Sequence, residues 1–393
     1  MDFSSIDIFC HVIDNYGDAG VVYRFANEFK NAHPRCRVRV FIDNLHTLCG
    51  IVPEIDNSTP VQEYKSITYV NTTDLDRSLA DSLGIADIMI EAFACHIPEP
   101  FMEKAYFQSK LIINLEYLSA EDWVEDFHLK ESLLGKGTVK KYFFMPGFTE
   151  NTGGLILNSD LKNHKRELVA KRHDFIDQVL KSNQFHFQDL PEKTIGTVFT
   201  YERGFDTMLR DLMQFNKDTL LLLFGHKTHN SMISSLKRLG VECSGDRQCN
   251  FHSAQILFIP FIDQHSYDSL LCCTDFNIVR GEDSLARAAI SGKPFIWNAY
   301  LQEEKYQKVK VLALLKVLQP YFNDNDLFDS YSRLMLEFNN ALKEDSTQVT
   351  EERYDSFFRN LNKIEHATEK FSYFIDRKCD LIAKLSDFLR EFN

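Results

Sequence analysis

The chain has 393 residues, a length that suits two or three domains of ordinary size. Apolar residues make up 44% and charged residues 26%, which is typical of a globular protein and excludes a disordered chain. Because 57 Asp and Glu outnumber 44 Lys and Arg, the formal net charge is −13, which argues against a nucleic-acid backbone or an anionic membrane as the main partner.

Several features favour a cytoplasmic protein. The sequence starts without the basic segment and small-residue cleavage site of a secretion signal. No apolar run approaches the about 18 residues of a membrane-spanning helix. The nine cysteines are odd in number, and several lie in apolar runs, which favours reduced thiols.

The N-terminal region predicts a strand, a helix and a second strand. A mostly apolar segment at 6–13 is typical of a buried parallel strand, and the glycine-bearing turn at 14–20 follows it. Apolar residues then recur at helical spacing over 21–29. Further buried strands are predicted over 38–42, 86–91 and 111–115.

A second series of strands and helices is predicted beyond residue 190. Its strands are expected at 194–200, 220–224, 256–261, 275–279 and 294–297, with helical patterns between them, including 285–290. Strands that alternate with helices indicate parallel, doubly wound α/β sheets. Two such series suggest two Rossmann-like domains.

The polar, glycine-bearing stretch at 147–165 is the best candidate for a crossing between these domains. We therefore expect an N-terminal domain at 1–155, a linker at 156–175, a second domain at 176–350 and a helical segment at 351–393. The sequence leaves open whether this last segment caps the second domain or packs back on the first.

The turn after the first strand carries Asp14 and Asp18. Ligands of open α/β sheets bind at the carboxyl ends of the strands, so two carboxylates there suit general-base chemistry or a cationic substrate. The glycines, including Gly17, allow close backbone approach. In the alternative interpretation Asp18 is only a helix N-cap and Asp14 a turn former.

A similar loop lies at 280–284, between the strand at 275–279 and a helix. Backbone N–H groups at the helix start, the Ser284 hydroxyl and Arg280 suit a phosphate group. The alternative is a helix cap formed by Asp283 or Ser284, which is compatible with phosphate binding.

Aromatic and amide side chains follow two other strands. Phe199 and Tyr201 end one strand, and Gln264 and Tyr267 follow another, so together they suit a nucleobase. The alternative is ordinary core, because Phe is abundant in this chain. Cys243, Cys249 and His252 match no zinc-binding spacing, so no metal site is expected.

Several collinear segments together resemble the EarP family, the protein-arginine rhamnosyltransferases that modify elongation factor P. They are the turn at 14–20 (DNYGDAG), 113–124 (INLEYLSAEDWV), 144–149 (FMPGFT) with 152–154 (TGG), 279–284 (VRGEDS) with Arg287 and Ala288, and 292–297 (GKPFIW). The resemblance extends from residue 6 to about residue 305. Beyond that, the C-terminal helices match only in general character.

The resemblance implies a GT-B glycosyltransferase, with two facing Rossmann-like domains and a cleft between them. It implies transfer of L-rhamnose from dTDP-β-L-rhamnose to an arginine of elongation factor P, with inversion and without a metal or other cofactor. The resemblance further implies that this modification activates the factor for relief of polyproline stalling.

The resemblance also assigns residues. The catalytic acids are Asp14, which orients the acceptor, Asp18, the general base, and Glu282 in the nucleotide-sugar loop. The donor is expected to contact Asn15, Tyr16, Gly17, Phe199, Tyr201, Gln264, Tyr267, Arg280, Gly281, Glu282, Asp283 and Ser284. This chain has Tyr16, Ala19 and Tyr267 at positions where the family more commonly has Phe, Ile and Phe. These differences affect the expected packing of the donor pocket.

Two other functions are compatible with these residues. One is a GT-B transferase that uses another nucleotide sugar or a small-molecule acceptor. The other is a non-catalytic module that binds a translation factor, against which the presence of Asp14, Asp18 and Glu282 counts.

Overall fold

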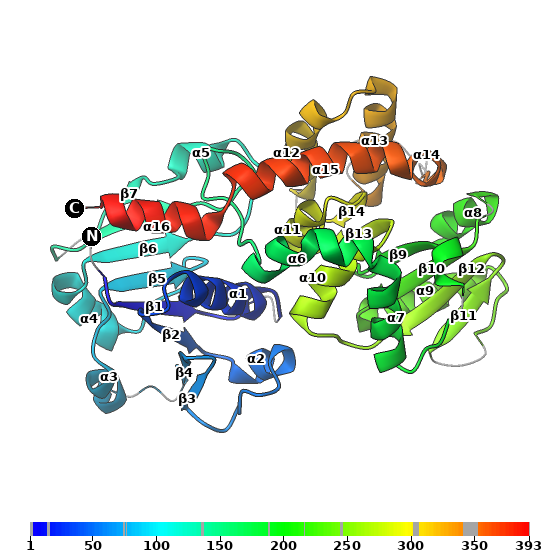
Figure 1. Cartoon of the computed structure of the whole chain (residues 1–393). Coiled ribbons are helices and arrows are strands. Elements are labelled where there is room, and N and C mark those ends of the chain that lie inside the picture. The colour runs from blue at the N-terminus through cyan, green and yellow to red at the C-terminus, as the bar shows by residue number, and fades with distance from the viewer. Residues whose placement is uncertain are drawn as a thin grey trace. The chain divides into compact units, whose positions relative to one another are not determined.

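The computed structural model describes residues 3–13, 16–73, 75, 77–134, 137–187, 189–215, 217–243, 247–301, 306–340 and 353–392 (Figure 1). The chain divides into two compact units. The first comprises residues 1–159 and 375–393, and the second comprises residues 160–374.

The first unit is built on an eight-stranded sheet with the order β3-β4-β2-β1-β5-β6-β8-β7. All neighbouring strands are parallel except the edge strands β3 and β7. The elements in chain order are β1 (Ser5–Cys10), α1 (Tyr16–Ala32), β2 (Arg37–Ile42), α2 (Leu45–Ile51), β3 (Val61–Tyr64), β4 (Ile67–Asn71), α3 (Arg77–Leu83), β5 (Ile88–Ala92), α4 (Glu99–Gln108), β6 (Leu111–Leu115), α5 (Trp123–Phe127), β7 (Glu131–Ser132), β8 (Lys140–Phe144) and, from the end of the chain, α16 (Leu381–Glu391).

The second unit contains a six-stranded sheet with the order β11-β12-β10-β9-β13-β14, in which only β11 is antiparallel to its neighbour. Its elements are α6 (Ser159–Ala170), α7 (Arg172–Ser182), the 3₁₀ turn η1 (Leu190–Glu192), β9 (Thr194–Val198), α8 (Asp206–Phe215), β10 (Thr219–Phe224), α9 (His226–Arg238), β11 (Gln248–Phe251), β12 (Ala254–Ile259), α10 (Gln264–Cys273), β13 (Phe276–Arg280), α11 (Gly281–Ser291), β14 (Phe295–Asn298), α12 (Gln307–Leu318), η3 (Gln319–Tyr321), α13 (Asn325–Phe338), α14 (Asp355–Arg359) and α15 (Leu361–Lys378).

Both faces of the first sheet are covered by helices, which explains why its central strands are apolar at successive positions. Ile6 and Ile8 of β1 pack with α1, α2 and α16 on one face. Phe9 of the same strand packs on the other face with Phe41 and with Phe101 of α4. Side chains alternate across a strand, so β1 contributes to both layers of core.

The C-terminal helices divide between the units. Phe358 of α14 packs its ring edge-on against Phe276 of β13, so this helix belongs to the second unit. The unit boundary falls within α15, after Phe374, and only the residues from Ile375 onward join the first unit. The helical character expected over 354–392 is confirmed, and the segment has both of the roles that the sequence left open.

The boundary between the two units falls after Ser159, within the stretch at 147–165 where a crossing was expected, and the residues before this boundary pack into the first unit. Phe148 and Leu155 are buried, and the Leu155 N–H donates to the carbonyl of Cys379 at 2.7 Å. Gly154 has a φ of +78°, and a Cβ at this position would lie 2.4 Å from the Cys379 carbonyl oxygen. The glycine therefore permits close packing within the first unit. Most of the expected linker at 156–175 is helical, in α6 and α7.

Lys384 of α16 holds the same stretch in place. Its ammonium group donates to the backbone carbonyls of Thr149, Glu150 and Thr152 at 3.3, 2.8 and 2.7 Å. Half-burial lowers the pKa of this ammonium group, since desolvation disfavours the charge. The end of the chain is thus anchored to the loop that follows β8.

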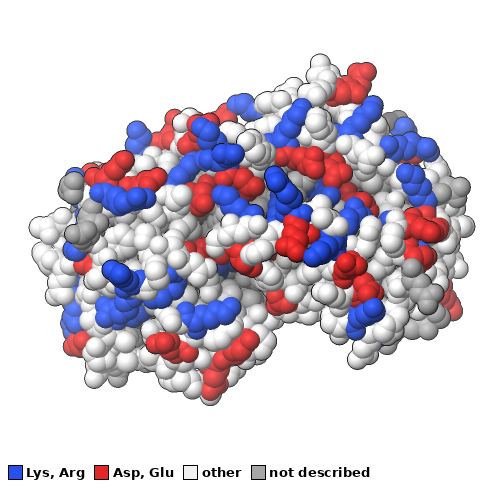
Figure 2. Space-filling model, in the orientation of Figure 1, with Lys and Arg blue, Asp and Glu red and all other residues white. Residues whose placement is uncertain are grey.

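The visible surface carries interspersed charges. On the face shown in Figure 2, Lys and Arg side chains alternate with Asp and Glu side chains over each unit, and neither sign forms a continuous field. None of the described helices is long and apolar enough to span a membrane.

Candidate active site

The order of the strands places one switch point in each sheet. In the first unit, the chain runs outward from β1 through β2 and β4, and then from β5 through β6 and β8 on the other side. Ligands of open α/β sheets bind at the carboxyl ends of the strands where this reversal occurs. The loops after β1, β5 and β6 therefore surround the expected site of the first unit.

Asp18 lies at this switch point, in the first turn of α1, and only 1% of its surface is exposed. Its Oδ2 accepts a hydrogen bond of 2.8 Å from the Ile13 N–H, and its Oδ1 accepts one of 3.0 Å from the Tyr117 hydroxyl. The start of a helix also favours a negative charge. The carboxylate is thus buried and oriented by groups from two different loops.

Tyr117 follows β6 and is 41% exposed. Its ring stacks on Phe93 with centroids 4.2 Å apart and planes 11° apart. Phe93 follows β5 and has a φ of 59°, a backbone conformation that is unfavourable for a side chain of this size. The loops after all three strands at the switch point therefore meet at the Asp18–Tyr117–Phe93 contact.

A second carboxylate holds the loop just before Asp18. Asp43, which follows β2, accepts a hydrogen bond of 2.9 Å from the Val12 N–H and also contacts Nδ1 of His11. His11 and Asp43 line a cavity of about 230 Å³ together with His96. Residues 11–13 are therefore fixed between Asp43 on one side and Asp18 on the other.

The expected site residues Asp14 and Asn15 lie outside the described residues. Tyr16 and Gly17 form the start of α1. The ring of Tyr16 lies against the backbone of Gly50 in α2, where an added Cβ would come within 2.6 Å of Cε1. The interpretation of Asp18 as a general base or cation ligand is therefore compatible with its position, and it lies within α1 rather than before it.

The switch point of the second unit lies between β9 and β13. Arg280 ends β13, and its guanidinium carbon lies 4.2 Å from the ring centre of Phe199 and 5.0 Å from that of Tyr201. Nη1 of Arg280 also donates to the Thr200 carbonyl at 3.3 Å. Cation–π contacts of this kind fix a planar guanidinium at the start of a helix.

The N-terminus of α11 follows directly. Gly281 has a φ of +65°, and its carbonyl accepts a hydrogen bond of 2.9 Å from the Trp297 indole. An added Cβ at Gly281 would lie 3.3 Å from the Tyr201 hydroxyl, so glycine suits this position both sterically and conformationally. Ser284 lies in the first turn, where helix N–H groups and the helix dipole favour an anion.

The acidic residues of this loop are ion-paired. Glu282 lies 3.1 Å from the ammonium of Lys310, and Asp283 lies 3.6 Å from Nε of Arg287. Arg280 is the N-cap residue of α11. Neither Asp283 nor Ser284 occupies the cap position, contrary to the alternative interpretation of this loop.

The aromatic and amide side chains expected at the nucleobase belong partly to the hydrophobic core and partly to the candidate site. Tyr267 of α10 contacts Phe199 and Phe224 edge-on, at 6.1 and 5.4 Å, and Phe199 and Tyr267 both pack against the core of the unit. Burial raises the pKa of Tyr267, so its hydroxyl stays protonated. Gln264 begins α10 and is half-buried. The structure therefore brings Phe199, Tyr201, Tyr267 and Arg280 together, and Phe199 serves both as core and as a contact of Arg280.

Comparison with known proteins decides the family. The chain matches, over residues 6–390, the family described as Elongation-Factor P (EF-P) rhamnosyltransferase EarP. It belongs to the EarP family.

Two relatives named protein-arginine rhamnosyltransferase agree with this assignment. The protein of Shewanella oneidensis is 31% identical, over 98% of this chain and 97% of its own length. The protein of Pseudomonas aeruginosa is 35% identical, over 80% of this chain and 81% of its own length. The expectation of an enzyme, a glycosyltransferase of the EarP family, is confirmed.

A solved structure supports the fold. It is described as the structural basis for EarP-mediated arginine glycosylation of translation elongation factor EF-P, and it matches with a TM-score of 0.62 and 20% identity over 98% of this chain and 99% of that one. With the two α/β sheets described above, this likeness confirms the expected fold class of an EarP-type glycosyltransferase.

Sequence reasoning missed Tyr117, Phe93 and Asp43 as site residues of this EarP-family chain. Tyr117 was within reach, because it lies in the segment 113–124 that resembles the family and follows a predicted strand. Among the described residues no group of three or more His, Cys, Asp and Glu side chains has the arrangement of a metal site.

Proposed function

We propose that this chain transfers L-rhamnose from dTDP-β-L-rhamnose to an arginine side chain of elongation factor P, with inversion at the anomeric carbon. Membership of the EarP family supports the sugar and the acceptor. The observation that carries the mechanism is the buried Asp18 carboxylate, which the Ile13 N–H and the Tyr117 hydroxyl hold at the switch point of the first sheet.

The acceptor chemistry explains why such a carboxylate is needed. A guanidinium group has a pKa above about 12 and is a poor nucleophile while it is charged. In our proposal Asp18 binds the guanidinium and accepts one proton while a guanidino nitrogen forms a bond to the anomeric carbon. The bond from that carbon to the diphosphate oxygen breaks in the same step, which inverts the centre and releases dTDP. The proposal includes Asp14 as the acid that orients the acceptor.

The second unit holds the donor in this proposal. Arg280 and the N-terminus of α11, with Gly281, Asp283 and Ser284, bind the diphosphate. Phe199, Tyr201, Gln264 and Tyr267 contact the nucleoside, and Asn15, Tyr16 and Gly17 complete the list of donor contacts. Because Arg280 is already held against two aromatic rings, little reorganisation is needed when the diphosphate charge develops.

Glu282 is the third acid of the proposal. Its pairing with Lys310 at 3.1 Å fixes the carboxylate beside the diphosphate loop. We further propose that the reaction needs no metal ion, since the guanidinium and the helix N-terminus supply the positive charge, and that the enzyme acts in the cytoplasm, where it relieves polyproline stalling through the modified factor.

The test is the intact mass of elongation factor P after incubation with the enzyme and dTDP-β-L-rhamnose. We expect a gain of one deoxyhexose residue, which persists when EDTA is present and which maps to an arginine. Asp18→Asn should abolish the gain while the circular dichroism spectrum stays unchanged. Turnover by the Asn variant at the wild-type rate would refute the general-base assignment. A gain in mass that occurs only with another nucleotide sugar would refute dTDP-β-L-rhamnose as the donor.

A further inference from the structure

Two carboxylates, those of Glu282 and Asp283, lie in the first turn of α11, where the proposed function places the diphosphate of the donor. The N–H groups and the dipole of a helix N-terminus favour an anion at this position. Carboxylates beside the same site repel an anion, and the repulsion is stronger where water is partly excluded. The loop therefore binds a diphosphate well only if cations offset the two acids.

Each of the two carboxylates is paired with a cation. Asp283 lies 3.6 Å from Nε of Arg287, which is four residues further along α11 and has a side chain only 4% exposed. Glu282 accepts a hydrogen bond of 3.1 Å from the ammonium of Lys310 in α12. The charge of Asp283 is thus offset from within α11, whereas the charge of Glu282 is offset by a residue of a different helix.

The packing of α12 fixes Lys310 at this place. The next residue, Val311, is completely buried, and so are Leu314 and Leu318 on the same helix. The helix also packs against α13 of the same unit. Because Lys310 and Glu282 have side chains only 23% and 25% exposed, the pair is partly shielded from solvent, and its charges act more strongly on a neighbouring anion than those of a fully exposed pair.

Lys310 determines the charge balance of the diphosphate loop. Residues 280–287 contain two cations, Arg280 and Arg287, and the two carboxylates described above. Lys310 adds one positive charge to this otherwise balanced set. Arg280 is oriented by two aromatic rings, whereas the ammonium of Lys310 contacts Glu282 itself. Loss of Lys310 would therefore leave the charge of Glu282 uncompensated beside the diphosphate.

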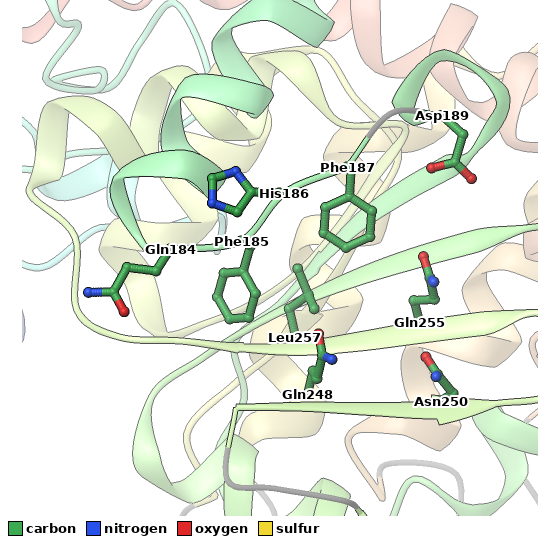
Figure 3. A pocket seen from close by; sticks show the side chains of 9 residues that line it. All are labelled: Gln184, Phe185, His186, Phe187, Asp189, Gln248, Asn250, Gln255 and Leu257. Atoms are coloured by element: carbon green, nitrogen blue, oxygen red, sulfur yellow. The ribbon is translucent and has the colours of Figure 1, made fainter.

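The large cavity of the second unit supplies no comparable charge. It has a volume of about 680 Å³ and lies between residues 184–187 and the hairpin of β11 and β12 (Figure 3). Among the described residues that line it there is no Lys or Arg, and the carboxylate of Asp189 in its wall is paired with Lys193 at 2.8 Å. A diphosphate is therefore expected at α11 and not in this cavity.

We propose that Lys310 is a positioning residue for donor binding, which acts through Glu282. Its ammonium offsets the charge of that carboxylate and holds it by a hydrogen bond, so that the N-terminus of α11 accepts the diphosphate. When dTDP leaves with its full negative charge, the same compensation stabilises it at the loop. The inference rests on the proposed function, in which this loop binds the nucleotide part of the donor.

Binding measurements on the full chain test this role without rhamnosyl transfer. Isothermal titration calorimetry gives the Kd of dTDP, and competition with dTDP gives the Kd of thymidine, which has the nucleoside but no phosphate. The variants are Lys310→Met, Lys310→Arg and the double variant that combines Lys310→Met with Glu282→Gln. The matched control is Lys316→Met, at an exposed position of the same helix. Each chain is measured at low and at high salt.

We expect Lys310→Met to raise the Kd of dTDP about tenfold at low salt and less at high salt, where the uncompensated charge of Glu282 is screened. The Kd of thymidine should stay within about twofold of the wild-type value, since the nucleoside carries no charge. Lys310→Arg and Lys316→Met should bind dTDP nearly as the wild type does. The double variant should regain most of the lost affinity, because it lacks the carboxylate that Lys310 offsets.

Wild-type affinity for dTDP in Lys310→Met would overturn the inference, and so would an equal loss of dTDP and thymidine binding, which indicates a structural role. A double variant that stays as weak as Lys310→Met would also overturn it, since Lys310 would then act on the diphosphate directly. If the wild-type chain does not bind dTDP, the proposed donor fails and this inference fails with it. Wild-type binding of dTDP that Lys310→Met leaves unchanged refutes this inference alone.

Discussion

The hydroxyl of Tyr117 donates a hydrogen bond of 3.0 Å to Oδ1 of the buried Asp18, although 99 residues separate the two along the chain. The ring of Phe93 stacks on the ring of Tyr117 and so fixes the orientation of the tyrosine. In the proposed mechanism the tyrosine acts through Asp18, because its hydroxyl holds that carboxylate. We therefore regard Tyr117 as a positioning residue for the proposed base.

Removal of this hydroxyl is the first prediction. Tyr117→Phe keeps the ring that stacks on Phe93 and removes only the hydrogen bond to Asp18. A hydrogen bond to a charged group contributes roughly 1.5–3 kcal/mol, so we expect kcat for rhamnosyl transfer to fall about 10- to 100-fold. Steady-state kinetics and Tm measure the effect, and Tm should change little.

The control for this prediction is Tyr142→Phe in β8. Tyr142 packs edge-on against Phe388 and Phe392 of the same unit, so the same atom is removed at an aromatic contact that does not include the residues assigned to the chemistry. This variant should keep the wild-type kcat. An equal loss of kcat in both variants, or no loss in Tyr117→Phe, would contradict the positioning role.

The second prediction concerns the guanidinium of Arg280. Arg280→Lys keeps the charge but loses the planar group that stacks on Phe199 and Tyr201. Lysine is a point charge on a flexible stem, so we expect the Kd for dTDP to rise about tenfold, as measured by isothermal titration calorimetry.

Arg359→Lys on α14 is the matched control, because Arg359 forms an exposed pair with Asp355 at 2.6 Å. Its affinity for dTDP should equal that of the wild type. Wild-type affinity in Arg280→Lys would show that the cation–π arrangement does not hold the nucleotide.

Most of the parallel strands were predictable because they are buried on both faces. Such strands are continuous apolar runs, as at β6, where the expected bounds 111–115 match the structure. The parallel strands β4 and β8 were not predicted, and both contain polar or partly exposed positions. The edge strands β3, β7 and β11 were not predicted either. They are only four, two and four residues long and alternate between exposed and less exposed positions, so no apolar run marks them.

The site was predictable where it follows a strand and not where it depends on tertiary contacts. Asp18, Arg280 and Ser284 could be proposed because a predicted strand precedes each of them by a few residues. The contacts of Asp18 with Tyr117 and of Val12 with Asp43 join residues far apart in the sequence, and no local pattern reports them. Likewise, the polar composition of 147–157 does not indicate that this segment is packed within the first unit. Its packing depends on the close contact between Gly154 and the backbone of Cys379.

The third prediction tests the anchoring of the C-terminus. Lys384→Met removes an ammonium that donates to three backbone carbonyls, at Thr149, Glu150 and Thr152. The stem of the side chain remains, but the carbonyls lose a charged donor, so we expect a loss of about 2 kcal/mol in the free energy of unfolding. Urea unfolding followed by circular dichroism measures it.

Lys378→Met is the control on the neighbouring helix α15. Lys378 forms an exposed pair with Glu150 at 3.3 Å, and such surface pairs contribute little. The free energy of unfolding of Lys378→Met should lie within about 0.5 kcal/mol of that of the wild type. If the two variants are equally stable, the anchoring role of Lys384 is disproved.

The fourth prediction concerns the pH dependence of stability. Burial and the nearby Lys384 lower the pKa of His128 from its ordinary 6.5 to about 4, and its Nδ1 accepts a hydrogen bond of 3.2 Å from the Met145 N–H. As the pH falls below 6.5, the unfolded chain takes up a proton before the folded chain does, so the contribution of this group to stability is lost between pH 6.5 and about 4. His128→Asn keeps an acceptor for Met145 but does not titrate, and we expect its free energy of unfolding to fall less than that of the wild type over this window. The matched control is the same substitution at an exposed position of α2, His46→Asn. Parallel slopes for the wild type and His128→Asn in urea unfolding at pH 7 and pH 5 would show that His128 does not contribute.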